Sequence, residues 1–258
     1  MTQSAPKTSS LGDTTAAQRL NPQRFVLDNG IVLLVTPNPT ADIVAARLFL
    51  QAGLRRETPD DWGLSHLVAS VITKGTQSHS ASEIAHIVES AGASLGTDSS
   101  PDYFLVSLKT VSEDFETVLA VAAEILRSPT FPERELETER KVTLQAIKNR
   151  AEQPLSLCLR PLRTALHGDH PYSQTSYGVQ ETVESLQVND LHRFHQQYFN
   201  PAEMVVSIAG NITPEQAKTL VSQYFGDWNS DHASASGQTA RVSQPLSSLQ
   251  VLTEAQDT

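Results

Sequence analysis

Apolar runs separated by turn residues predict strands in the first part of the chain. Residues 24–28 and 31–35 flank Asn29-Gly30, the dipeptide that most strongly favours a tight β-hairpin turn. Residues 43–51 predict a third strand of similar character. Further strands are expected at residues 93–97, 103–110 and 203–209. The chain therefore contains enough strand signals for one substantial sheet.

Apolar residues with a helical period occupy the segments between these strands. One helix over residues 82–91 has Ser80 or Ser82 as its N-cap, and Pro132 opens a long helix that Pro154 ends. Other helices are expected at residues 62–73, 113–127 and 214–225, with two shorter ones between residues 154 and 199. Because strands and helices do not alternate strictly, the fold class is α+β rather than doubly wound.

Composition narrows the range of functions. The chain has 258 residues, 39% of them hydrophobic, and a formal net charge of −10 from 19 basic and 29 acidic residues. An acidic chain without a basic cluster does not favour a nucleic acid as partner. Its one cysteine, Cys158, excludes an intramolecular disulfide framework and, because it lies among leucines, is expected to be a small core residue.

The two ends of the sequence differ from the middle. Residues 1–21 and 230–258 are rich in Ser, Gln and Ala, so we expect a disordered leader, with a transit peptide as alternative, and a linker or tail. Residues 22–229 are expected to form the folded domain. No apolar run is long enough for a transmembrane segment, which favours a cytoplasmic location, with an organelle or the periplasm as alternatives.

The predicted helix after Gly63 carries part of a zinc-binding pattern. The inverted motif H-x-x-E-H places two His ligands one helical turn apart, with a general-base Glu beside the second. Here His66 stands in the first His position, Ala69 in the Glu position and Ser70 in the second His position. A catalytic zinc site needs three protein ligands and a water molecule. The residues predict that this site has lost its metal, and His66 alone is more simply a packed histidine.

Three blocks of sequence follow one another in a specific order. His66 is followed by Lys74-Gly75-Thr76, and a second block runs over residues 131–150. A third block contains His170-Pro171-Tyr172 and the segment over residues 191–210. Together, over roughly residues 24–228, these blocks resemble the N-terminal half of the family of pitrilysin and the mitochondrial processing peptidases. The resemblance implies one antiparallel-rich mixed sheet that is covered on one side by helices.

The resemblance also implies the roles of residues outside the first block. In the family, the helix over residues 131–150 supplies the third zinc ligand, a Glu, at the position of Ala146, and an outer Glu that survives here as Glu139. An edge strand beside the bound peptide has an Asn at the position of Gly96. The tentative substrate-binding residues are Leu95, Gly96, Thr97 and Asp98.

The altered positions favour a non-catalytic, peptidase-like subunit. Such a subunit pairs with a homologous zinc-containing subunit to form a chamber that processes or degrades an extended peptide, and zinc is expected only in the partner. One alternative is an active zinc metallopeptidase with atypical ligands, and another is a purely structural subunit of a larger complex. Whether the chain is an enzyme by itself is left open, although the lost motif favours an inactive one.

Two further pairs of histidines could bind a metal. His167 and His170 form one pair, and His192 and His195 form the other. No carboxylate or cysteine cluster completes either pair, so no metal site is predicted there.

Overall fold

Six strands form one sheet in the computed structural model, which describes residues 21–229. The order across the sheet is β1-β2-β6-β3-β5-β4, and every neighbouring pair is antiparallel except β2 with β6. The strands are β1 Gln23–Val26, β2 Val32–Pro37, β3 Ile43–Leu50, β4 Ser94–Ser99, β5 Phe104–Val111 and β6 Val205–Gly210. The expected antiparallel-rich mixed sheet is confirmed. The leader and the tail expected at the two ends lie outside the described residues, apart from residue 21.

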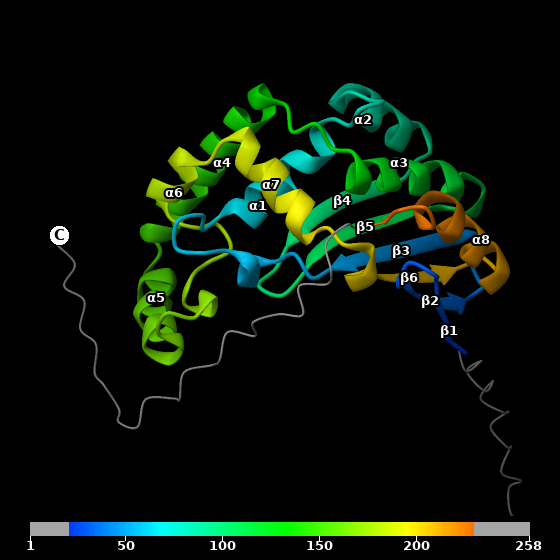
Figure 1. The fold of residues 1–258 in the computed structure, drawn as a ribbon, viewed down its shortest axis with the longest axis horizontal. Coiled ribbons are helices and arrows are strands. Elements are labelled where there is room, and N and C mark those ends of the chain that lie inside the picture. Colours follow the sequence, from blue (N-terminus) through cyan, green and yellow to red (C-terminus); the bar gives the residue numbers. More distant parts are fainter. Residues whose placement is uncertain (1–20, 230–258) are drawn as a thin grey trace, which may run out of the picture.

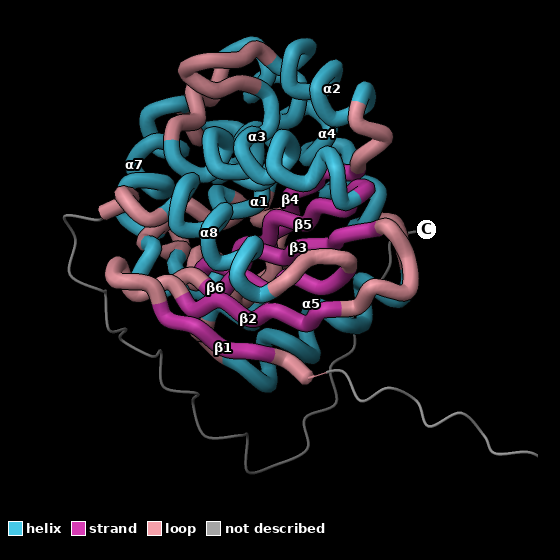
Figure 2. The backbone as a smooth tube through the Cα atoms, turned by 90° about the vertical axis from the view of Figure 1, so that its right-hand side faces the viewer, coloured by secondary structure: helices cyan, strands magenta, loops and turns pink. Residues whose placement is uncertain are grey.

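Most helices pack on one face of this sheet, while α5 lies apart from the helical layer at one end of the molecule (Figures 1 and 2). The helices are α1 Leu64–Val71, α2 Ala81–Ser90, α3 Phe115–Arg127, α4 Glu133–Ala151, α5 Pro154–His167, α6 Gln180–Ser185, α7 Val188–Tyr198 and α8 Pro214–Phe225. None of the helices in the described part is long and apolar enough to cross a membrane.

The segment between residues 154 and 199 contains three helices, so the prediction of two was wrong. A loop with positive φ at Gly168 and Gly178 separates α5 from α6. Leu186 and Gln187 then adopt extended backbone angles, which end α6 after six residues and begin α7. Sequence periodicity misses this break because α6 is too short to establish a helical period.

Strand alternation determines where the core lies. In β3, Val44, Ala46, Leu48 and Leu50 are buried, while the residues between them are exposed or half-buried. The buried face packs against α1 and α3, whose apolar residues complete one core. Each fully buried Leu or Val contributes roughly 1.5–3 kcal/mol relative to an exposed one, so this layer provides most of the stabilisation.

The predicted hairpin forms, and its turn also anchors the last helix. Gly30 adopts a φ of 92°, which the turn requires and which glycine adopts readily. The Asn29 side-chain amide donates to the carbonyl oxygens of Phe225 at 2.7 Å and Trp228 at 3.0 Å. The Asn-Gly turn therefore fixes the C-terminal end of α8 against the start of the sheet.

The prediction that Cys158 is a core residue was wrong. Cys158 is exposed, and no residue of α5 is buried. Leu155 is 70% exposed, and Leu162 and Leu166 are each 48% exposed. The spacing of these four residues places them on one stripe of the helix. The apolar period correctly predicted a helix, but a period cannot show whether a partner element covers the apolar stripe.

The exposure of Cys158 predicts its reactivity in the native protein. We expect Ellman's reagent to modify one thiol per chain without denaturant, at a rate within a few-fold of that in urea. Cys158→Ser should change the free energy of unfolding by less than about 0.5 kcal/mol, because the side chain loses no packing. A native thiol that reacts only after unfolding would show that α5 packs elsewhere in solution.

Candidate functional site

Helix α1 carries the predicted zinc positions at the centre of the helical layer. It packs against α4, α7 and the edge strand β4. Ala69 is buried, and His66 and Ser70 are half-buried. The structure therefore brings the residues of the zinc-motif helix next to α4, which carries Glu139 and Ala146, and next to the edge strand.

Glu57 fixes the N-terminus of α1. Its two carboxylate oxygens accept hydrogen bonds from the backbone N–H groups of Gly63 at 2.8 Å and Ser65 at 2.7 Å. The hydroxyl of Ser99 in β4 donates to the Ser65 hydroxyl at 2.9 Å. Burial raises the pKa of Glu57 to about 7, against the opposing effect of hydrogen bonds from Ser65 and Gly63. Sequence reasoning missed Glu57; the available signal was an acidic residue shortly before a helix whose N-cap, Gly63, has no side chain.

The side chains of Tyr177 and Arg150 pack beside His66. The rings of His66 and Tyr177 lie 4.5 Å apart between centroids, and the Arg150 guanidinium carbon lies 4.1 Å from the Tyr177 centroid. Burial lowers the pKa of His66, although Asp98 and Glu139 act in the opposite direction. A neutral imidazole packed on a phenol therefore occupies this side of α1. Tyr177 and Arg150 were also missed, since nothing local in the sequence links them to His66.

The remaining predicted positions have partners within the fold. The hydroxyl of Ser70 donates to the carbonyl oxygen of His66 at 3.0 Å, a bond within its own helix. Glu139 is paired with Lys74, whose Nζ lies 3.1 Å from its carboxylate. Ala146 is half-buried on α4, one turn before Arg150.

This set of donors does not suit a zinc ion. His66 is the single imidazole of the motif, the Ser70 hydroxyl is bonded to backbone, and Glu139 is paired with a lysine. Throughout residues 21–229, no group of three or more His, Cys, Asp or Glu side chains could hold a metal. Zinc needs three such ligands for catalysis.

The other paired histidines take part in packing. The Nε2 atom of His195 lies 2.8 Å from the carbonyl oxygen of Leu126, and burial lowers the pKa of His195 to about 4. Its neighbour His192 packs edge-on against Phe131. His170 accepts a hydrogen bond from the backbone N–H of Tyr172 through Nδ1 at 3.2 Å. Both pairs thus tie segments of the fold together.

The predicted peptide-binding strand is the edge of the sheet. β4 pairs with β5 on one side, and its other side is the end of the strand order. Thr97 donates from its hydroxyl to the carbonyl oxygen of Ala69 at 2.6 Å, and Leu95 packs on the core. At Gly96 an added Cβ would meet only the Ser107 hydroxyl, at 3.8 Å. A side-chain hydrogen bond therefore joins the edge strand β4 directly to helix α1.

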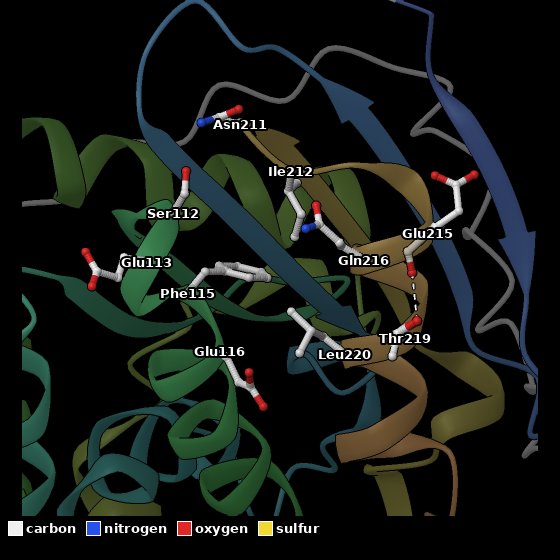
Figure 3. Close-up of a pocket in the computed structure, with 10 residues that line it drawn as sticks. All are labelled: Ser112, Glu113, Phe115, Glu116, Asn211, Ile212, Glu215, Gln216, Thr219 and Leu220. Atoms are coloured by element: carbon white, nitrogen blue, oxygen red, sulfur yellow. Dashed lines mark hydrogen bonds between the residues drawn. The ribbon is translucent and has the colours of Figure 1, made fainter.

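A separate cleft of about 480 Å³ lies between the first turns of α3 and α8 (Figure 3). Phe115 and Leu220 line it together with Glu116 and Glu215, which stand in the first turns of their helices. Acidic residues are favoured there because they complement the helix dipole. Glu116 also accepts a hydrogen bond from the hydroxyl of Tyr224 at 3.0 Å. Helix stabilisation thus accounts for the acidic residues of this cleft.

Comparison with known proteins relates this chain to peptidases. The family model described as Insulinase (Peptidase family M16) matches residues 32–178, and the one described as Peptidase M16 inactive domain matches residues 185–257. An uncharacterized zinc protease of Bacillus subtilis, YmxG, is 29% identical over 92% of this chain and 56% of its own length. A probable mitochondrial-processing peptidase subunit beta of Schizosaccharomyces pombe is 26% identical over 87% of this chain and 49% of its own length.

Solved structures show the same fold. The peptidase M16 inactive domain from Pseudomonas fluorescens superposes with a TM-score of 0.79 at 23% identity, over 88% of this chain and 54% of that one. A protease from Helicobacter pylori gives a TM-score of 0.78 at 21% identity, with the same coverage. The chain spans about half the length of the relatives that it matches.

Gly178, next to Tyr177, lies so close to Gly63 that we expect a larger residue at position 178 to be strongly destabilising. A Cβ added to Gly178, where φ is 74°, would lie 2.2 Å from the Trp62 oxygen and 2.7 Å from Gly63 Cα. We expect Gly178→Ala to lower the free energy of unfolding by about 3 kcal/mol or more in urea titrations. Gly92→Ala is the control, because its φ of 55° is also positive but nothing lies within 4 Å. Gly92→Ala should lower the free energy of unfolding by only about 1 kcal/mol. Equal losses would contradict the close packing.

The raised pKa of Glu57 predicts a specific pH dependence. The folded chain holds this proton more tightly than the unfolded chain, so the stabilising contribution is present at low pH. It is lost as pH rises from 4.5, the ordinary pKa, to about 7. Glu57→Gln cannot ionise, so its side chain keeps one charge state over this pH range.

We therefore expect the wild type to lose on the order of 2–3 kcal/mol relative to Glu57→Gln between pH 5 and pH 7.5, measured by urea unfolding. Histidine titrations are common to both proteins and cancel in this difference. A difference that stays constant with pH would show that Glu57 titrates normally.

Proposed function

Because this chain belongs to the insulinase family of peptidases, family M16, we propose that it is a non-catalytic half of a peptide-processing chamber. Its partner is a homologous half that carries the zinc and the general base. Peptide lies in the space between the two halves. The observation that carries this proposal is the replacement of zinc ligands on α1 and α4 by Ser70 and Ala146, beside the packed His66 and Tyr177.

An active peptidase with substitute ligands is the main alternative. It needs three donors aimed at one point and a base beside a bound water. Ala69 cannot move a proton, and Glu139 is engaged with Lys74. The environment of His66 therefore favours a packed site over a catalytic one.

Two surface features support the partner and the peptide in this proposal. The leucine stripe of α5, formed by Leu155, Cys158, Leu162 and Leu166, is apolar and exposed, as expected of a surface that another polypeptide covers. The chain also spans about half the length of its relatives. The open edge of β4 can accept an extended peptide through main-chain hydrogen bonds.

Zinc content and peptide cleavage test the proposal. We expect the purified chain to hold less than about 0.1 zinc per chain and to cleave no peptide, because it lacks two of the three ligands and the base. Ser70→His with Ala146→Glu restores the ligand set and should raise the zinc content toward one per chain. Without a base at position 69, this double variant should still cleave nothing. Zinc is measured by elemental analysis after dialysis, and cleavage with a fluorogenic peptide mixture.

The decisive comparison adds a homologous subunit with an intact H-x-x-E-H motif. Cleavage that requires both chains supports the proposed role. Stoichiometric zinc and chelator-sensitive cleavage by the wild-type chain alone would overturn it in favour of the active peptidase. A complex that forms but never cleaves peptide would favour the purely structural subunit.

A further inference from the structure

The cleft between α3 and α8 has an apolar floor and an acidic rim. Its apolar side chains are those of Phe115, Ile212 and Leu220, and its carboxylates are those of Glu113, Glu116 and Glu215 (Figure 3). The helix starts stabilise these carboxylates, but none of them forms an ion pair within the described part of the chain. Such a cleft complements a segment that offers one cation next to an apolar side chain.

Helix α8 lies along β1, and both begin at the same end of the sheet. The Nζ atom of Lys218, the single cation of α8, lies 5.6 Å from the centroid of the Phe25 ring in β1. β1 begins opposite Val35 in β2, near the end of the sheet where β6 passes into α8. The chain that precedes β1 therefore leaves the sheet close to the first turn of α8.

Glu215 is the rim carboxylate on the side of β1. It lies one turn before Lys218 and therefore on the same side of α8, which is the side that packs on β1. In Figure 3 its carboxylate points away from Phe115 and toward β1, whereas the carboxylate of Glu113 points away from the cleft. Glu215 is exposed, and its side chain has no partner among the described residues.

The leader that precedes β1 has the matching chemistry. It contains two cations, Lys7 and Arg19, against the single acid Asp13, whereas the whole chain has a net charge of −10. Arg19 is followed directly by Leu20, which supplies the cation and the apolar group together. Two strand spacings, about 10 Å, separate β1 from β6 and the start of α8. Three extended residues cover about this distance, so the residues just before β1 reach the cleft.

The other terminal segment is placed less favourably. Residues 230–258 contain a similar pair, Arg241-Val242, but they follow the C-terminal end of α8. A helix of 12 residues is about 18 Å long, so this tail starts at least one helix length from Glu215. Connectivity therefore favours the leader as the occupant of the cleft.

We propose that the leader docks on this cleft, with the Arg19 guanidinium paired with the Glu215 carboxylate and Leu20 on the apolar floor. Because the leader is tethered to β1, its effective concentration at the cleft is roughly millimolar, so these weak surface contacts are sufficient. The inference differs from the sequence-based expectation of a disordered leader or a transit peptide. It is independent of the proposed function.

Limited trypsin digestion of the full chain tests the docking. Trypsin cleaves after Lys7, Arg19 and Arg241, and mass spectrometry measures the three rates in one sample. Cleavage after Arg19 tracks the fraction of undocked leader, and Lys7 provides the internal standard. The nearby strand β1 also slows trypsin at Arg19, so the evidence is the change between variants. A synthetic peptide of residues 1–24 with the same substitutions gives the intrinsic rates.

Two variants should release the leader. Glu215→Gln removes the ion pair and should speed cleavage after Arg19 by about two- to fivefold relative to Lys7. Leu20→Ser removes the apolar contact and should speed it by about fivefold or more, after correction by the peptide. Raising the salt concentration should act like Glu215→Gln in the wild type and have little further effect in that variant.

Matched controls change the same residue types outside the proposed contact. Glu113→Gln removes a carboxylate that lines the cleft but points away from it, and Leu11→Ser removes the other leucine of the leader. Both should leave cleavage after Arg19 within about 1.5-fold of the wild type.

Three results would overturn the inference. Unchanged cleavage after Arg19 in both Glu215→Gln and Leu20→Ser would show that the leader does not occupy the cleft. If Glu215→Gln speeds cleavage after Arg241 instead, the tail is the occupant. Protection of Arg19 that grows with protein concentration would assign the cleft to a second copy of the chain. None of these results bears on zinc content or peptide cleavage, which test the proposed function separately.

Discussion

The buried first turn of α1 sets the constraint on which the centre of the molecule depends. Backbone N–H groups at a helix start have no partner within the helix, and burial makes an unpaired donor costly. Gly63 cannot cap them, so the carboxylate of Glu57 accepts two of them. The same turn contacts β4 through Ser65 and Ser99. The position of the edge strand thus depends on a carboxylate that lies outside both elements.

Helices α1 and α4 are held together mainly by packing. A structural zinc contributes about 10 kcal/mol or more to folding, whereas a cation–π contact contributes roughly 0.5–2 kcal/mol. The stack of Arg150 on Tyr177 cannot replace an ion by itself. Burial supplies the difference, since most residues of α1 lie in the core. The buried Arg140 also donates to the carbonyl oxygens of Val183 and Leu186, which ties α4 to the C-terminal end of α6.

The sequence predicted features that depend on local chemistry and missed those that depend on distant contacts. The Asn29-Gly30 hairpin and the helix opened by Pro132 follow from backbone preferences of single residues, and both form. Cys158 was wrongly predicted to be buried, because a leucine-rich helix has the same apolar sequence pattern whether or not another element covers it. Glu57 and Tyr177 reach α1 from separate loops, through geometry that no local pattern encodes. The resemblance to a family supplied the correspondence between α1 and α4 that periodicity lacked.

The two faces of the sheet are under different constraints on residue type. Residues that point inward are constrained by packing, because a volume change of even one methylene disturbs the contacts of a densely packed core. Outward positions such as Arg47 have no such constraint and can vary in charge at little cost to folding. At the edge strand, Gly96 has no side chain, so a peptide that paired with β4 would meet only main-chain groups at this residue.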